Sequence, residues 1–330
     1  MVTLSPFSNS PKTVGSVTQL RIYPIKSCRG IQITSSFLTK RGLDLDRRWM
    51  FVDGSTNKFI TIRDISELTL IDTAFTGSRG GDDEQLVISI RNTDKSVIVP
   101  ARPTEQWLAA NATLAEVDIW EYDTDGYVYS DEINSVFTEF FKKPVKLVYK
   151  GPTPRVLRGN GAPDVLGREQ YTDFPDVLPL LIANEGSLLE LNGRLRKKGV
   201  DEISIERFRP NVVVDLEGAE AWSEDSWKTV RIVNQETSGV ASLFGGSGLD
   251  IDVAARCARC QVPNVNPETG EKNAHEPWDT LVSYRRVDEG IKWKPCFGML
   301  SVPRSEGAVA VGMRFEVLEE TEDHKYIKGF

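Results

Sequence analysis

Histidine and cysteine are scarce in this sequence of 330 residues, which contains two histidines and four cysteines. So few histidines weaken the case for most zinc enzymes and for hydrolases that use a histidine base. The sequence also shows no secretory signal, and in that setting a few cysteines are typical of a reduced, intracellular protein. We therefore expect free thiols and a cytoplasmic location.

Long hydrophobic runs and an excess of basic residues are also missing. The longest notable apolar stretch, residues 177–183, is far shorter than the roughly 18 residues of a membrane-spanning helix. The formal net charge is −8, whereas nucleic-acid-binding proteins usually carry a basic surface. We therefore expect neither a membrane span nor a nucleic-acid partner. The polar residues 1–13 are predicted to form a disordered tail.

What the sequence does contain is a series of short β-type runs and few helical patterns. Helical spacing of apolar residues predicts helices over residues 131–142, 184–198 and 277–286, which begin near Ser130 or Asp131, at Asn184 and at Pro277. Residues 150–176, rich in glycine and proline, are predicted to be a long irregular segment. Many strands without regular βαβ alternation predict a mixed α/β, β-rich fold, with a β-barrel core and peripheral helices. The predicted strands cover residues 17–23, 31–38, 49–52, 59–62, 86–90, 97–99, 117–120, 145–149, 212–216, 230–233, 251–254, 297–302 and 315–318.

The sharpest local motif is Cys257-Ala-Arg-Cys260. A structural zinc site would need a second pair of ligands at suitable spacing, and a thioredoxin-like dithiol would precede a helix, whereas turn residues follow here. One or two inert thiols in a strand are the plain structural interpretation. The functional interpretation is a single thiolate that acts as a ligand or nucleophile. Arg256 and Arg259 flank the thiol, and nearby cations favour a thiolate.

Three further motifs combine cations with hydrogen-bonding groups. Residues 23–30 place Lys26 and Ser27 at a strand end, where they suit an anionic oxygen group such as phosphate. Residues 44–49 offer Arg47 or Arg48, and residues 207–211 offer two arginines on one side of an extended segment. Taken singly, each motif is explained by a solvated strand end or a surface ion pair. Together with Arg63 they predict a cationic pocket beside a thiolate, which suits a phosphate-bearing cofactor with a soft metal.

The order of these motifs resembles the MOSC superfamily, and within it the mitochondrial amidoxime-reducing components. The similarity begins with Val-Gly-Ser-Val-Thr-Gln-Leu-Arg-Ile-Tyr-Pro at residues 14–24 and covers nearly the whole chain. It includes Ala-Trp-Ser-Glu-Asp-Ser-Trp at residues 221–227 and Asn-Pro-Glu-Thr-Gly at residues 266–270. The resemblance implies a MOSC-type β-barrel domain that binds a cofactor and is built from residues 14–48 and 151–330. Residues 49–150 would form an inserted, N-terminal MOSC-associated region.

The resemblance also implies a molybdenum cofactor, a molybdopterin whose metal is bound by one protein cysteine. Cys260 falls on the position of that metal ligand and would be the catalytic residue. Ala258 departs from the serine usual at its position, so a side-chain hydrogen bond is lost, and Cys257 falls on a non-ligand position. The residues that fall on cofactor-contact positions are Lys26, Ser27, Arg47, Arg209, Asn211, Ala258 and Arg259.

The implied activity is the reduction of N-hydroxylated compounds, such as amidoximes and hydroxylamines, by removal of oxygen. Electrons would come from a separate partner, a cytochrome b5-type protein with a flavin reductase. Asp176 and either Arg155 or Arg158 are candidates for the pocket rim. Two alternatives stay open, which are a sulfur carrier with a persulfide on Cys260 and a non-catalytic protein that binds the cofactor. No pyridoxal-phosphate desulfurase domain precedes the MOSC-like region, which disfavours the sulfur carrier.

Overall fold

The computed structural model describes residue 11, residues 13–234 and residues 248–329. Of the predicted tail, residues 1–10 and 12 lie outside this part of the chain, and Thr13 is the first residue of strand β1.

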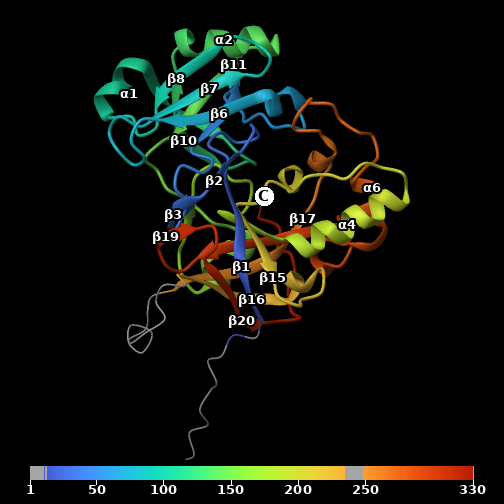
Figure 1. The fold of residues 1–330 in the computed structure, drawn as a ribbon. Coiled ribbons are helices and arrows are strands. Elements are labelled where there is room, and N and C mark those ends of the chain that lie inside the picture. The colour runs from blue at the N-terminus through green and yellow to red at the C-terminus, as the bar shows by residue number, and fades with distance from the viewer. Residues whose placement is uncertain (1–10, 12, 235–247, 330) are drawn as a thin grey trace, which may run out of the picture.

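A closed barrel of seven strands forms the lower half of the molecule in Figure 1. Its strands follow the order β15-β14-β18-β17-β16-β20-β1, and antiparallel pairing of β1 with β15 closes the ring. Each barrel strand therefore has a hydrogen-bonded neighbour on both sides, which leaves no exposed edge. The bounds are β1 (Thr13–Ile22), β14 (Leu180–Asn184), β15 (Val212–Leu216), β16 (Trp227–Val233), β17 (Leu249–Ala258), β18 (Cys296–Pro303) and β20 (Arg314–Glu320).

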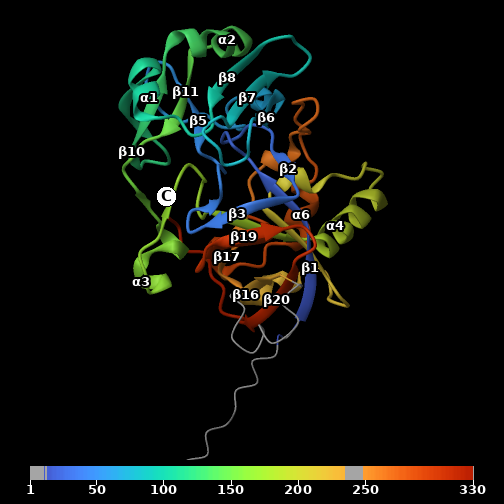
Figure 2. The same cartoon turned by 60° about the vertical axis from the view of Figure 1, so that its left-hand side comes forward.

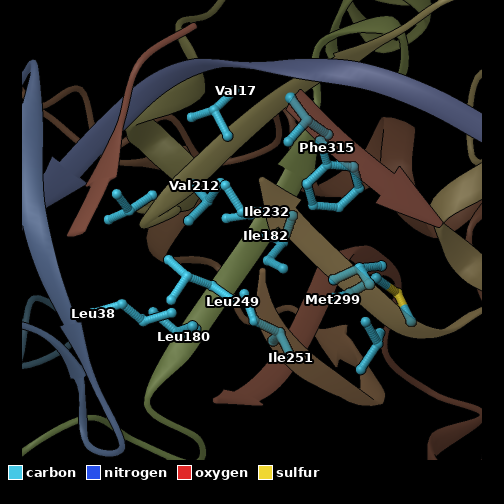
Figure 3. Close-up of a cluster of buried hydrophobic side chains, with 14 of the residues drawn as sticks. Val17, Leu38, Leu180, Ile182, Val212, Ile232, Leu249, Ile251, Met299 and Phe315 are labelled. Carbon is cyan, nitrogen blue, oxygen red and sulfur yellow. The ribbon is translucent and has the colours of Figure 1, made fainter. Parts of the chain in front are cut away.

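Buried aliphatic and aromatic side chains fill the barrel. Figure 3 shows Val17 and Phe315, from opposite ends of the chain, in the same cluster as Ile182, Val212 and Met299. Each of these five side chains is at most 1% exposed, so the two chain ends are held together by a shared apolar core. Four further short strands pair either with the barrel strand β1 or with one another. Strand β2 (Ile31–Ile33) pairs with β1, and β3 (Ser35–Thr39) pairs with β4 (Gly42–Leu43) and with β19 (Gly307–Ala310).

The upper part of the molecule is built from the middle of the first half of the sequence, as both Figure 1 and Figure 2 show. A four-stranded antiparallel sheet has the order β5-β11-β10-β9, and a three-stranded sheet has the order β6-β7-β8. A core separate from that of the barrel contains Trp49 and Phe51, and Phe137 of helix α2 (Asp131–Phe141) packs on the Phe51 ring. The elements are β5 (Trp49–Asp53), η1 (Ser66–Leu70), β6 (Ile71–Thr76), β7 (Gln85–Ile90), β8 (Ser96–Pro100), α1 (Glu105–Asn111), β9 (Ala112–Asp118), β10 (Asp123–Tyr129), α2 (Asp131–Phe141) and β11 (Val145–Lys150).

Helices and short turns cover the side of the barrel. Helix α4 (Glu185–Lys197) makes the crossover that the parallel pair β14 and β15 requires. The Asn184 side chain caps it by accepting a hydrogen bond from the backbone amide of Gly186 at 3.0 Å. Helix α6 (Trp278–Tyr284) packs beside α4 (Figure 1). The remaining short elements are β12 (Arg155–Val156), η2 (Gly159–Gly161), α3 (Pro163–Leu166), β13 (Tyr171–Thr172), η3 (Ile205–Phe208), η4 (Ser223–Ser226), η6 (Val262–Asn264) and η7 (Glu289–Ile291).

The β-rich fold with a barrel core and peripheral helices is confirmed, but individual elements depart from the prediction. Residues 59–62 do not form a strand, because only Phe59 makes an isolated bridge, to Val52, and Ile60 and Ile62 are buried by packing instead. The sequence reasoning missed α1, β6, β10 and β14. Strand β14 is buried at all five positions, so the alternation that marks a half-buried strand is absent there.

Candidate functional site

A cavity of about 260 Å³, called here the main cavity, opens where the barrel meets the upper part of the molecule. The loop after β1, the turn before β5, the segment around η3 and the end of β17 contribute to its wall, and Ile62, Arg63 and Trp120 come from the upper part. All the residues predicted as site residues line it, although they are spread over more than 200 positions of sequence. They are Lys26, Ser27, Arg47, Arg209, Asn211, Ala258, Arg259 and Cys260.

The wall of the main cavity is strongly cationic. Its lining contains seven basic side chains and one carboxylate, that of Asp176, in a protein whose formal net charge is −8. Such a concentration of one charge in a cleft raises the local concentration of anions and favours their binding. The seven are Lys26, Arg47, Arg63, Arg207, Arg209, Arg259 and Lys294.

Lys26 is buried at the inner side of this wall. Its backbone amide donates to Trp49 O at 2.8 Å, which joins the loop after β1 to strand β5. Its ammonium group donates to Phe174 O at 2.9 Å and contacts the Asp176 carboxylate. Burial lowers the pKa of Lys26 to about 8, although Asp176 works in the opposite direction. Lys26 therefore loses its charge at a pH that is easily reached in solution.

The pKa of the Asp176 carboxyl group is lowered by cations of the same wall. Desolvation raises the pKa of a carboxyl group, but here Lys26 and Arg63 outweigh it and hold the pKa of Asp176 well below its usual range. The Trp120 indole also donates to Asp176 Oδ1 at 3.0 Å. The prediction that Asp176 lies at the pocket is thus matched by its position. Arg155 lies behind it and donates to Asp173 O, Pro175 O and Asp176 O at 3.0, 2.8 and 3.2 Å, whereas Arg158 faces Tyr122 in a neighbouring small cavity.

Arg47 and Arg209 lie on the ring of Tyr23, at 4.8 and 4.2 Å from its centroid. Both have positive φ, 48° and 60°, as does Ser27 with 68°. Backbone strain of this kind collects at ligand sites, where surrounding structure holds it in place. Arg209 Nη1 donates to Cys28 O at 2.7 Å, while its Nη2 is buried without a hydrogen-bond partner among the described residues. An unpartnered guanidinium nitrogen in the cavity wall fits an anionic group such as the phosphate of a cofactor.

Two predicted contact residues make several hydrogen bonds to other parts of the protein. Asn211 Oδ1 accepts from Arg47 Nη1 at 3.0 Å and from the Leu181 amide at 3.2 Å, and Asn211 Nδ2 donates to Arg21 O at 3.3 Å. The Arg259 guanidinium donates to Phe208 O and Phe297 O, with distances of 2.9 to 3.0 Å. These hydrogen bonds hold the Asn211 and Arg259 side chains in place in the cavity wall.

Cys260 follows the end of β17 and is half-buried at the cavity. The flanking arginines do not approach its thiol as the sequence suggested. Arg256 turns to His324 O at 2.9 Å, and Arg259 is held by the two carbonyls just described. Arg63 takes their place, because its Nη2 donates to Cys260 Sγ at 3.3 Å. The neighbouring Cys257 is also at the cavity, and burial raises the pKa of its thiol.

Arg63 itself is positioned by two groups that the sequence did not connect to it. Its guanidinium lies 5.0 Å from the centroid of the Trp120 ring, and its Nη2 is 3.7 Å from Asp176 Oδ2. The sequence marked Arg63 only as an isolated cation. Almost 200 residues separate it from Cys260, so no local pattern could reveal the contact.

Comparison with known proteins shows the family to which this chain belongs. Residues 14–144 match the family model described as the MOSC N-terminal beta barrel domain, and residues 170–316 match the MOSC domain. The chain is 30% identical over 308 residues to bovine mitochondrial amidoxime reducing component 2, which covers 91% of this chain and 82% of the relative. The chain belongs to the MOSC-domain family.

Two other relatives of this MOSC protein differ in the share of their length that it spans. The human mitochondrial amidoxime-reducing component 1 is 30% identical over 309 residues, covering 91% of this chain and 82% of the relative. The molybdenum cofactor sulfurase of rice is 30% identical over 311 residues, covering 89% of this chain but 33% of the relative. Within the described part of the MOSC protein, no helix has the length and apolarity to cross a bilayer. The same residues contain no cluster of three or more histidine, cysteine or acidic side chains that could hold a metal ion.

Proposed function

We propose that this protein binds a molybdenum-pterin cofactor through Cys260 and reduces N-hydroxylated compounds. The observation that carries the proposal is a half-buried thiol at the edge of a cavity lined by seven cationic side chains. A thiolate is a suitable ligand for a soft metal centre, and the cations suit the phosphate of the pterin. The relatives are named for amidoxime reduction and for the molybdenum cofactor, which supports the same conclusion.

In this proposal the chain holds the cofactor from two sides. Cys260 is the metal ligand, with Arg63 as hydrogen-bond donor to its sulfur. Lys26, Arg47 and Arg209 neutralise the phosphate, and Arg209 Nη2 offers an unused donor for it. Ser27, Ala258 and the backbone at Arg259 complete the contacts, while Asn211 positions Arg47. Residues 14–48 and 151–330 form the cofactor-binding domain, and residues 49–150 form a region that supplies Arg63 and Trp120.

When bound, the cofactor supplies the two-electron chemistry that cleaves the substrate N–O bond, giving an N–H group and water with two protons from solvent. The two electrons come from a separate donor, a cytochrome b5-type protein reduced by a flavin reductase. The protein residues bind, orient and neutralise charge around this reaction. The relatives are named mitochondrial; for this chain a cytoplasmic location is our proposal, which cell fractionation tests.

The first experiment measures molybdenum and released pterin in the protein purified from a host that makes the cofactor. The wild type should carry near-stoichiometric molybdenum and reduce benzamidoxime with an artificial electron donor. Cys260→Ser should lose the metal or retain it without activity, and the matched variant Cys257→Ser should keep both. A folded wild type without molybdenum or pterin would contradict the proposal.

The similarity to a molybdenum cofactor sulfurase favours one alternative, a persulfide carried on Cys260. Mass spectrometry of the purified protein distinguishes the two functions. A sulfur carrier would gain a transferable sulfur atom on Cys260 and contain no molybdenum. A protein that holds molybdenum but reduces no N-hydroxylated compound with any donor would instead be a non-catalytic cofactor-binding protein.

A further inference from the structure

A second cavity of about 250 Å³, called here the side cavity, adjoins the main cavity next to Cys260. Ile62, Arg63 and Val262 line both cavities, so the side cavity begins where the main cavity reaches the thiol. Gln261, which follows Cys260 directly, is also part of its wall. A compound in the side cavity would therefore lie beside the proposed metal ligand without displacing anything from the cationic wall of the main cavity.

The lining of the side cavity has an apolar part and a cationic part. Ile62, Val262 and Val265 provide the apolar surface, and Arg63 and Lys272 provide two positive charges, with no carboxylate among the lining residues. Its volume is slightly below the roughly 300–1,000 Å³ of typical ligand pockets. The cavity thus suits a small organic body, such as a single ring, that also carries a negative charge.

The two cations differ in how far they are already engaged. Arg63 is occupied by Cys260, Asp176 and Trp120. Lys272 is exposed, and within residues 13–234 and 248–329 no carboxylate lies within ion-pair distance of its ammonium group. A backbone bridge between Val265 and Lys272 fixes the lysine at the wall of the cavity. Its charge is therefore available to a ligand.

We propose that the side cavity binds the organic part of the substrate and that Lys272 selects N-hydroxylated compounds that carry a carboxylate. The N-hydroxylated end points toward Cys260, the body lies against Ile62, Val262 and Val265, and the carboxylate reaches Lys272. This assignment of the substrate class rests on the proposed reductase function, because the side cavity can select substrates only if the reaction takes place beside Cys260.

The test separates binding from turnover by using amides, which have the shape of the substrates but no N–O bond to reduce. Calorimetry with the cofactor-loaded protein should show that para-carboxybenzamide binds about fivefold more tightly than benzamide, the effect of one exposed ion pair. Lys272→Gln should abolish this preference and Lys272→Glu should reverse it. The control Lys40→Ala removes an exposed lysine that lies in neither cavity and should leave the preference unchanged.

Equal affinities for the two amides in the wild type, or no detectable binding of either, would overturn the assignment of the side cavity. Turnover of benzamidoxime and para-carboxybenzamidoxime is then measured on the same samples. If the amide preference depends on Lys272 but neither amidoxime is reduced, the reductase function fails while the binding site stands. If both amidoximes are reduced with equal kcat/KM in wild type and Lys272→Gln, the specificity role of Lys272 fails while the reductase function stands.

Discussion

At the scale of single residues, the contact between Arg63 and Cys260 is the feature of the site that most directly affects the thiol. A hydrogen bond from a guanidinium group to a charged acceptor contributes about 1.5–3 kcal/mol. We therefore expect Arg63→Met to lower kcat/KM for amidoxime reduction by at least about tenfold, since about 1.4 kcal/mol corresponds to a factor of ten.

Arg63→Lys is the matched variant, because it keeps the positive charge near Cys260 but loses the planar group that lies on Trp120. It should retain part of the activity. Molybdenum content is measured in each variant, so that a change in the reaction is separated from loss of the cofactor. Wild-type activity in Arg63→Met would show that the contact at 3.3 Å has no role in the reaction.

The lowered pKa of Lys26 gives a pH dependence that can be tested without the cofactor. Its pKa of about 8 lies below the ordinary value of 10.5, so the folded protein loses this positive charge as the pH rises through 8. Sulfate keeps its two charges over this range and serves as the probe. Its affinity for the cofactor-free protein should fall by about threefold or more between pH 7 and pH 9, an effect of about 0.7 kcal/mol or more.

Lys26→Met should bind sulfate more weakly at pH 7 and should show no such decrease up to pH 9, because the remaining arginines stay charged. An affinity that falls equally in wild type and Lys26→Met would assign the pH dependence to another group.

At the scale of secondary structure, the side chain that caps the start of helix α4 also forms a hydrogen bond to a buried carboxylate. The Asn184 side chain accepts from the Gly186 amide and donates to Glu224 Oε2 at 3.2 Å, and Ser187 Oγ donates to the same oxygen at 2.8 Å. Glu224 is fully buried, and burial raises its pKa to about 7. Asn184→Ala removes the cap and also one donor to this carboxylate, so we expect a loss of about 2–3 kcal/mol in the free energy of unfolding.

The control is Thr104→Ala at the start of α1, where the Thr104 hydroxyl accepts from the Trp107 amide at 3.2 Å near the surface. That substitution removes a cap but leaves no buried charge behind, so about 1 kcal/mol should be lost. Urea unfolding followed by tryptophan fluorescence measures both. Equal losses would show that the contact with Glu224 adds nothing to the cap.

At the scale of the whole molecule, stability depends on closing the barrel between β1 and β15, two strands that are far apart in the sequence. Gly15 of β1 lies against β15, and a Cβ atom added there would be 2.1 Å from the backbone oxygen of Asp215. Since backbone cannot move away easily, Gly15→Ala should lower the free energy of unfolding by about 2–3 kcal/mol.

Gly193→Ala is the opposite case, because Gly193 lies within α4 and a Cβ atom there meets nothing within 4 Å. It should raise stability by up to about 1 kcal/mol, the difference in helix propensity between alanine and glycine. The midpoint of urea unfolding distinguishes the two, and a neutral effect of Gly15→Ala would mean that β1 and β15 can separate without cost.

The sequence by itself was enough to predict the β-rich fold class, and it named candidate residues that the structure places around one cavity. Short strand-like runs indicated a β-rich fold, and the caps of α2 and α4 were found within one residue. The resemblance of the ordered motifs to the MOSC superfamily then pointed to Lys26, Arg47, Arg209 and Cys260. The strand and cap signals are local, since each depends on residues within a few positions of one another.

Only the tertiary structure decided which side chains meet. Burial at every position hid β14, because alternation disappears when both faces of a strand are covered. Side-chain direction turned Arg256 and Arg259 away from Cys260 and brought Arg63 to it from the other part of the molecule. Such contacts follow from the closure of the barrel and the packing of two cores, which sequence spacing does not encode.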